Sequence, residues 1–107
     1  MHNINFHDSV IVALEGANGV LTIKLESVET DKGPIDVTFH VSGVSEMRMD
    51  HEKHYVIGMT GDDGEVLKLD WKGSRLEMLV IWENYKARQR STCLYEIEFS
   101  GAITLTM

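Results

Sequence analysis

Residues 67–82, LKLDWKGSRLEMLVIW, decide the fold, because they have the pattern of two β-strands joined by a tight turn. Apolar side chains at Leu67, Leu69 and Trp71 alternate with charged ones, which is the period of a strand with one buried face. The sequence Lys72-Gly73-Ser74-Arg75 then predicts a two-residue turn of type II′, in which glycine takes the first central position. The stretch therefore predicts an antiparallel β-hairpin.

The hairpin turn also predicts which residues of the two strands face each other. On the core side it pairs three apolar couples: Trp71 with Leu76, Leu69 with Met78, and Leu67 with Val80. On the other face it pairs like charges, Lys72 with Arg75 and Asp70 with Glu77. Directly opposed like charges mildly destabilise a sheet, and the diagonals Lys72–Glu77 and Asp70–Arg75 relieve this repulsion.

Strand alternation extends over most of the chain, and turn-forming residues separate the alternating runs. Four further runs have an apolar residue at every second position: residues 21–25, 35–41, 93–99 and 103–107. Residues 76–85 are apolar on both faces, which predicts a central strand buried on both sides. We therefore expect one all-β domain over residues 1–107, a meander of about eight to ten antiparallel strands that forms a sandwich or half-barrel.

The charge of the chain restricts its partners. It has 17 acidic and 10 basic residues and a formal net charge of −7. This sign argues against binding to nucleic acid or to an anionic membrane, and it permits attraction to a basic protein. Three of the basic residues, Lys86, Arg88 and Arg90, lie in the polar segment 84–92, which predicts a loop or a short helical turn.

Cysteine content and apolar runs indicate the compartment. The single cysteine, Cys93, can form no internal disulfide and takes an inward position of its strand. Residues 1–10 have neither the basic stretch nor the apolar run of a secretory signal. The longest aliphatic and aromatic run, residues 78–82, is too short to span a bilayer. We expect a cytoplasmic protein.

The opening segment contains the residue types of a hydrolase triad, His7, Asp8 and Ser9, in adjacent positions. Triad side chains converge from separate parts of a chain, whereas consecutive residues of an extended segment point to opposite faces. No G-x-S-x-G motif is present. We therefore interpret the segment as a strand entry, anchored by Phe6, in which Asp8 or Ser9 bonds a neighbouring backbone group.

Two further segments contain residue types that bind metals. His51 and His54 would share one face of a helix, but no third ligand stands at a recognisable spacing, so a solvated turn is the preferred interpretation and zinc binding stays open. The segment Asp62-Asp63-Gly64-Glu65 lacks the pattern of a calcium loop and predicts a hairpin turn. We expect no cofactor and no metal.

Acidic side chains on the wet face of the sheet are the candidate binding groups. Asp70 and Glu77 are expected to join Glu96 and Glu98 of a nearby strand in one rigid acidic face for Lys and Arg side chains. The alternative is a solvated ladder of alternating charges without a binding role. The full candidate set for partner binding is Asp62, Asp63, Glu65, Asp70, Glu77, Glu96 and Glu98.

Three short motifs carry a resemblance to small bacterial proteins: Phe6-His7-Asp8-Ser9 at the opening, Val41-Ser42-Gly43-Val44 in a later strand, and Leu79-Val80-Ile81-Trp82 in a hydrophobic strand. This layout resembles immunity proteins of bacterial toxin systems, including contact-dependent growth inhibition. The resemblance implies an antidote without catalytic residues, which binds a cognate toxin and blocks its active site. A ribonuclease is one expected kind of toxin, since nucleases hold phosphates in a basic cleft.

Three other functions stay open. A small-molecule-binding module would hold its ligand in the mouth of the half-barrel, with His40 or Tyr95 among the polar groups. A hydrolase would use His51 or His54, converging with a carboxylate in a cleft. A structural or interaction protein would be joined to its partner through an open sheet edge.

Overall fold

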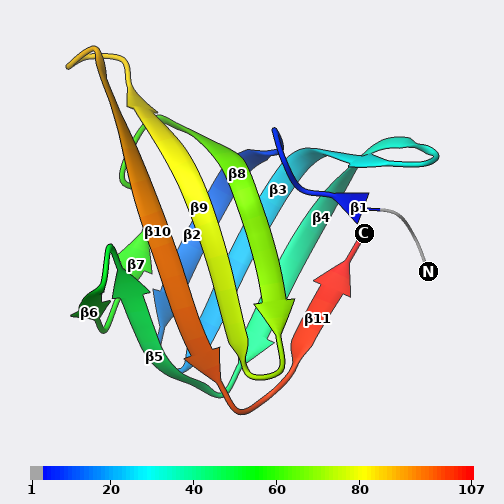
Figure 1. Ribbon diagram of the computed structural model, residues 1–107, viewed down its shortest axis with the longest axis vertical. Helices are drawn as coiled ribbons and strands as arrows, with labels where there is room; N and C mark the ends of the chain where they lie inside the picture. The colour runs from blue at the N-terminus through cyan, green and yellow to red at the C-terminus, as the bar shows by residue number, and fades with distance from the viewer. Residues whose placement is uncertain (1–3) are drawn as a thin grey trace.

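Eleven strands make up the part of the chain that this computed structural model describes, residues 4–107, and they form one open antiparallel sheet. The all-β prediction is thereby confirmed (Figure 1). The strands are β1 (Ile4–Asn5), β2 (Val10–Ala17), β3 (Val20–Thr30), β4 (Gly33–Ser42), β5 (Val44–Met49), β6 (Glu52–His54), β7 (Ile57–Gly58), β8 (Asp63–Lys72), β9 (Arg75–Asn84), β10 (Gln89–Phe99) and β11 (Ile103–Thr106).

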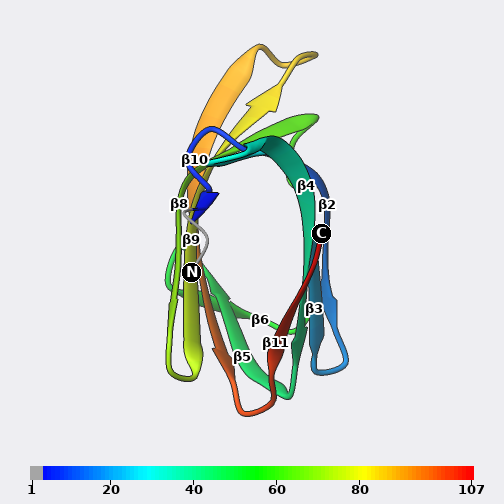
Figure 2. The same ribbon diagram turned by 90° about the vertical axis from the view of Figure 1, so that its right-hand side faces the viewer.

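The sheet folds over on itself into two layers (Figure 2). One layer has the order β11-β4-β3-β2, and the other has β8-β9-β10-β5-β6. The layers are continuous because β2 pairs with β8 at Val10↔Glu65 and Ile11↔Gly64. In Figure 1 the strands of the front layer cross those of the back layer, as in sandwiches whose layers pack at a large angle. The result is a flat molecule with extents of 38 × 37 × 17 Å.

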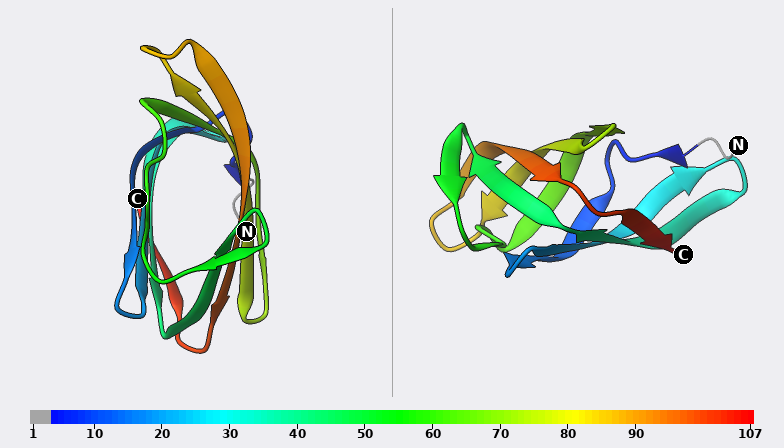
Figure 3. Two further views of the ribbon diagram at one scale, coloured as in Figure 1. Left: turned by 90° about the vertical axis from the view of Figure 1, so that its left-hand side faces the viewer. Right: turned by 90° about the horizontal axis from the view of Figure 1, so that it is seen from below.

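The chain changes layers at two Ser-Gly corners that touch each other. One corner joins β4 to β5 at Gly43, and the other joins β10 to β11 at Gly101. The N–H of Ser42 donates to the Ala102 carbonyl over 3.0 Å, and the N–H of Ser100 donates to the Gly43 carbonyl over 2.8 Å. A Cβ atom on Gly101 would lie 2.4 Å from the carbonyl oxygen of Ser42, so the close approach requires glycine. Figure 3 shows the two layers joined at this lower end.

The core lies between the layers, and Trp82 of β9, Tyr95 of β10 and Phe39 of β4 are its largest buried side chains. Strand β9 lies between β8 and β10, so its predicted central position is confirmed. Its predicted burial on both faces is wrong, because Leu79 and Ile81 on the outer face are only half-buried. The opposite layer, β11-β4-β3-β2, covers one face of β9, and the other face of β9 borders solvent.

The predicted hairpin is present, with four of its five register pairs as expected. Gly73 has φ +62° and Ser74 is not in the positive-φ region, as a type II′ turn requires. The fifth pair is wrong, because a β-bulge between Val66 and Lys68 places Val66, and not Leu67, opposite Val80. Leu67 is the extra residue of the bulge, so every residue of β8 before Leu67 pairs with β9 one position away from the predicted partner.

The structure also tests the predictions for the opening segment, for residues 84–92 and for Cys93. The hydroxyl of Ser9 donates to the Phe6 carbonyl over 2.6 Å, which confirms the strand-entry interpretation of the opening segment. Residues 84–92 form a tight turn flanked by strand residues, without a helical turn. Cys93 is buried, as its inward position predicted. Within residues 4–107 the structure has no helix that is long and apolar enough to cross a bilayer.

Candidate functional site

The seven carboxylates singled out in the sequence fall into two separate groups. The first group lies where β8 begins and comprises Asp62, Asp63 and Glu65. The second group lies on the outer face of β8, β9 and β10 and comprises Asp70, Glu77, Glu96 and Glu98. Asp63 and Asp70 are seven residues apart on one strand, which corresponds to roughly 20 Å. A single partner side chain therefore cannot contact both groups.

The second group forms the expected row across three strands, but its charges are paired within the protein. Asp70 lies opposite Glu77, and Glu77 lies opposite Glu96. The guanidinium of Arg75 contacts the Glu96 carboxylate and also lies 3.2 Å from Glu77. Lys68 lies 3.4 Å from Asp70. The arrangement is a charge ladder in which Asp70, Glu77 and Glu96 each have a cation as a partner, while the exposed Glu98 forms no ion pair among the described residues.

Glu96 is the most enclosed member of this ladder, with 9% of its surface exposed. Besides Arg75, its carboxylate has His51 as a partner, with 3.0 Å between His51 Nδ1 and Glu96 Oε1. His51 stands in a turn with φ +71°, next to Asp50, whose carboxylate accepts the Leu94 N–H over 2.9 Å. These contacts fasten the turn between β5 and β6 onto β10.

The first group lies at a surface pocket of about 270 Å³, here named the acidic pocket. Its carboxylates are Asp8, Asp63, Glu65 and Glu83, and its apolar walls are Val10 and Ile81. The negative charges act on one another, because a hydrogen bond with Asp8, partial desolvation and the charge of Asp8 raise the pKa of Glu65. The acidic pocket thus brings four carboxylates close together, and two of them have a cationic or imidazole side chain beside them: Asp8 lies 3.0 Å from His7, and Glu83 pairs with Arg90.

An exposed tyrosine stands beside the acidic pocket and is held in place by it. The hydroxyl of Tyr85 donates to Asp63 over 2.8 Å, and its backbone N–H donates to Asp62 over 2.9 Å. The same hydrogen bond with Asp63 raises the pKa of Tyr85. Tyr85 is 60% exposed, so its ring is presented to solvent in a fixed orientation. The guanidinium of Arg90 pairs with Glu83 over 2.6 Å at the rim.

Sequence reasoning missed Asp8 and Glu83 as members of this site. Glu83 lies directly opposite Asp63 in the β8–β9 ladder, and the predicted register extended back through the bulge would have misplaced it by one residue. Asp8 reaches the pocket because its N–H donates to the Val66 carbonyl over 2.8 Å, which brings the strand entry beside β8. No local sequence signal predicts that contact between distant segments.

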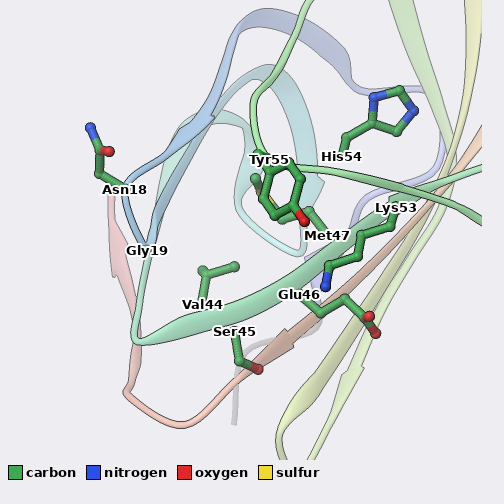
Figure 4. A pocket seen from close by; sticks show the side chains of 9 residues that line it. All are labelled: Asn18, Gly19, Val44, Ser45, Glu46, Met47, Lys53, His54 and Tyr55. Carbon is green, nitrogen blue, oxygen red and sulfur yellow. The ribbon is translucent and has the colours of Figure 1, made fainter.

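A second surface pocket, of about 260 Å³, lies between the β2–β3 turn and the segment that follows β5 (Figure 4). Val44 and Met47 provide apolar surface, and Tyr55 lines the same pocket. The ammonium of Lys53 lies 5.5 Å from the centroid of the Tyr55 ring, a cation–π distance. Tyr55 is 79% exposed, so its ring borders solvent at this pocket.

The remaining candidate residues do not assemble into one site. Tyr95 is buried and its hydroxyl accepts the Trp82 indole N–H, whereas His40 is exposed on β4. His51 does meet a carboxylate, Glu96, but it does so on an exposed turn. Within the described residues no cluster of three or more His, Cys, Asp or Glu side chains is placed to hold a metal ion.

Comparison with protein-family models, with curated proteins and with solved structures finds no significant match to this chain. The site is therefore interpreted from its own residues.

Proposed function

We propose that this chain is an immunity-type protein, a non-enzymatic inhibitor that binds a bacterial toxin domain in the cytoplasm and blocks its active site. One observation carries the proposal: four carboxylates gather at the acidic pocket, and two of them, Asp63 and Glu65, form no ion pair among the described residues, whereas Asp8 lies 3.0 Å from His7 and Glu83 pairs with Arg90. The resemblance of the opening segment and of two later strands to immunity proteins supports the same function.

The chemistry of the acidic pocket suits a partner whose active site is basic. A nuclease toxin binds phosphates with Lys and Arg side chains, and carboxylates on a rigid surface can occupy the same positions. Complementary charge also accelerates encounter, toward roughly 10⁸ M⁻¹s⁻¹ at low salt. A carboxylate that already repels its neighbour, as Asp8 repels Glu65, gains a favourable partner when a cation arrives.

Tyr85 can act as an anchor residue that adds affinity to the attraction between charges. Protein interfaces obtain most of their affinity from a few anchors, and Tyr is among the commonest. Hydrogen bonds from its hydroxyl and its backbone N–H to Asp63 and Asp62 hold Tyr85 at the rim of the acidic pocket. Because its orientation is fixed before binding, less side-chain entropy is lost when a partner covers the ring.

The proposal predicts that the gene next to this one encodes a toxin domain, and the test uses that domain. Co-expression of this chain should restore growth to cells that produce that domain, and purified samples should form a stoichiometric complex. The double variant D63K/E65K should lose most of the affinity and of its salt dependence, because two attractive charges become repulsive. A matched variant, D36K/E29K, changes the net charge equally at exposed positions of β4 and β3 and should bind normally.

Normal affinity of D63K/E65K would remove the acidic pocket from the interface. Equal loss of binding in both double variants would show that only the net charge matters. Failure of the wild-type chain to protect cells, or turnover of a substrate by the isolated chain, would reject the immunity function itself.

A second candidate function is a small-molecule-binding module, and the pocket in Figure 4 is the observation that favours it. Its lining combines the Tyr55 ring, the apolar Val44 and Met47 and the cation of Lys53, while the Glu46 carboxylate is paired with Arg48, and this combination suits a small aromatic anion. Such a ligand should raise the melting temperature of the wild-type chain and have no effect on the Y55A variant. A screen of aromatic carboxylates that yields no such shift rejects this candidate.

A further inference from the structure

Strand β8 has one edge that is only partly covered. It pairs with β9 along its length, but on its other side it meets β2 only at its first residues. The N–H of Val66 donates to the Ser9 carbonyl over 2.8 Å, and the Val66 carbonyl accepts the N–H of Asp8, which extends this cover by one residue. Within the described part of the chain, no strand pairs with residues 68–72 on that side.

The hairpin register determines which backbone groups point toward this free edge. Lys72 and Arg75 close the two-residue turn as a hydrogen-bonded pair, and hydrogen-bonded and non-hydrogen-bonded pairs alternate along the ladder. Leu69 and Trp71 therefore direct their N–H and C=O groups away from β9. Residues 68–72 contain no proline, and the bulge of β8 comes before Lys68. Two of the features that normally prevent an edge strand from pairing with another strand are therefore missing here.

The hairpin places like charges directly opposite each other on its outer face, and the contacts of Lys68 with Asp70 and of Arg75 with Glu77 offset only part of this repulsion. Asp70 lies directly opposite Glu77, and Lys72 lies directly opposite Arg75, so two like pairs face each other across the ladder. Such a local conflict is typical of positions that serve something other than stability. Along the free edge, in contrast, the signs alternate from Lys68 to Asp70 to Lys72, which a second antiparallel strand of the same sequence can complement.

Most two-fold pairings of β8 with a second copy are unfavourable. An axis through Asp70 would place Asp70 opposite its own equivalent and Lys68 opposite Lys72, which repel. An axis through Leu69 would place Lys72 beside Val66 of the second copy. The opening segment already occupies that place, because its backbone is bonded to Val66.

An axis through Trp71 avoids both problems. It places Lys72 opposite Asp70 of the second copy, twice by symmetry, and the overlap ends near Lys68, before it reaches the covered part of the edge. Trp71 is 41% exposed, and contacts with Phe39 and Phe6 at centroid distances of 5.6 and 6.1 Å hold its ring in place. In this register the exposed side of each Trp71 ring is covered by the other.

We propose that this chain forms a two-fold dimer in which the β8 strands of two copies pair in antiparallel fashion about Trp71. The sheet then continues from β9 and β8 of one copy into β8 and β9 of the other. The overlap is short, so the dimer is weak and forms at high concentration. The proposal does not depend on the immunity function, because it uses a different edge of the molecule.

Sedimentation equilibrium from about 10 µM to about 1 mM tests the proposal directly and should show a monomer–dimer transition. Trp82 is buried in the monomer, so a blue shift of tryptophan emission with concentration reports the covering of Trp71. The variants D70K and K72D should each weaken association by about fivefold or more, because two attractive pairs become repulsive. The double variant D70K/K72D restores opposite charges across the axis and should dimerise like the wild type.

Both single variants should leave the monomer folded, because the repulsion that each removes across the ladder offsets the contacts that it loses, such as that of Asp70 with Lys68, and this separates loss of dimerisation from loss of folding. D70K places a cation opposite Glu77, and K72D places a carboxylate opposite Arg75, so each replaces a repulsive pair by an attractive one. D36K, at an exposed position of β4, controls for net charge and should leave the dimer intact.

A chain that stays monomeric up to about 1 mM overturns the proposal and leaves the edge to a strand of another protein. A dimer that D70K does not weaken, or that D70K/K72D does not restore, places the contact on another surface and also overturns it.

Discussion

The indole N–H of Trp82 donates a hydrogen bond to the hydroxyl of Tyr95 over 2.9 Å in the core between the two layers. The two side chains come from adjacent strands, β9 and β10, and both are almost fully buried. This bond lets the core contain two polar atoms without leaving either unpaired.

The Y95F variant tests that bond. It removes the acceptor and leaves the Trp82 N–H buried without a partner, which should lower the free energy of unfolding by about 1–3 kcal/mol. Urea denaturation measures the change, and Y55F, at an exposed tyrosine, is the control that should unfold like the wild type. Equal stability of Y95F and the wild type would mean that the indole N–H finds another acceptor.

Alkaline pH should destabilise the protein through the same residue. Burial raises the pKa of Tyr95 above its ordinary value of 10.0, and the nearby Cys93 adds to the effect. The folded state therefore keeps a proton that the unfolded state loses, so stability is complete below about pH 10 and falls as the pH rises further. Melting temperatures measured between about pH 8 and about pH 11 should fall less steeply for Y95F than for the wild type.

The hairpin from β8 to β9 shows how far local pattern can predict this structure. Gly73 and the alternation on both sides of it determine the pairing of Trp71 with Leu76, which depends on neighbouring residues alone. The bulge at Leu67 could not be predicted, because Val66 and Leu67 are two apolar residues in a row and nothing in the sequence marks which of them faces the core. The alternation predicts the register correctly as far as the bulge and not beyond it.

Contacts between distant segments lie beyond such reasoning. The pairing of β10 with β5 and of β4 with β11 depends on the two Ser-Gly corners, whose glycines resemble ordinary turn glycines in the sequence. The acidic pocket has the same origin, because Asp8 joins Glu65 only through the backbone contact of the opening segment with Val66. The composition predicted an acidic surface, and the topology decides which carboxylates stay unpaired.

The contact between the two corners predicts a difference between two glycine substitutions. In G101A the new Cβ would lie 2.4 Å from the Ser42 carbonyl oxygen, so the backbone of one corner must move. The free energy of unfolding should therefore fall by about 2–4 kcal/mol. In G73A nothing lies within 4 Å, and only the left-handed φ of +62° is unfavourable, which should cost about 1 kcal/mol. Chemical denaturation of both variants measures the difference, and equal losses would show that the corners are not in tight contact.

The carboxylate of Glu96 should contribute to stability through its hydrogen bond with Arg75 and its contact with His51. E96A leaves Arg75 and His51 without their shared carboxylate and should destabilise the fold by about 1–2 kcal/mol, since Arg75 itself is well solvated. A double-mutant cycle with R75A measures the coupling, which should be favourable. E98A removes a neighbouring exposed carboxylate from the same strand and should have little effect. Additive effects of E96A and R75A would show that the two side chains act independently.

The acidic pocket makes a prediction that requires no partner. Because the hydrogen bond with Asp8 is the largest cause of the raised pKa of Glu65, the D8N variant should lower the pKa of Glu65 toward its ordinary value of 4.5. Asn is acceptable at this position, where φ is +70°, since it tolerates the left-handed region well. Carboxyl chemical shifts followed by NMR through an acid titration give the pKa directly. D36N, on the other layer, should leave the Glu65 titration unchanged, whereas an unchanged Glu65 in D8N would place its interaction partner elsewhere in the pocket.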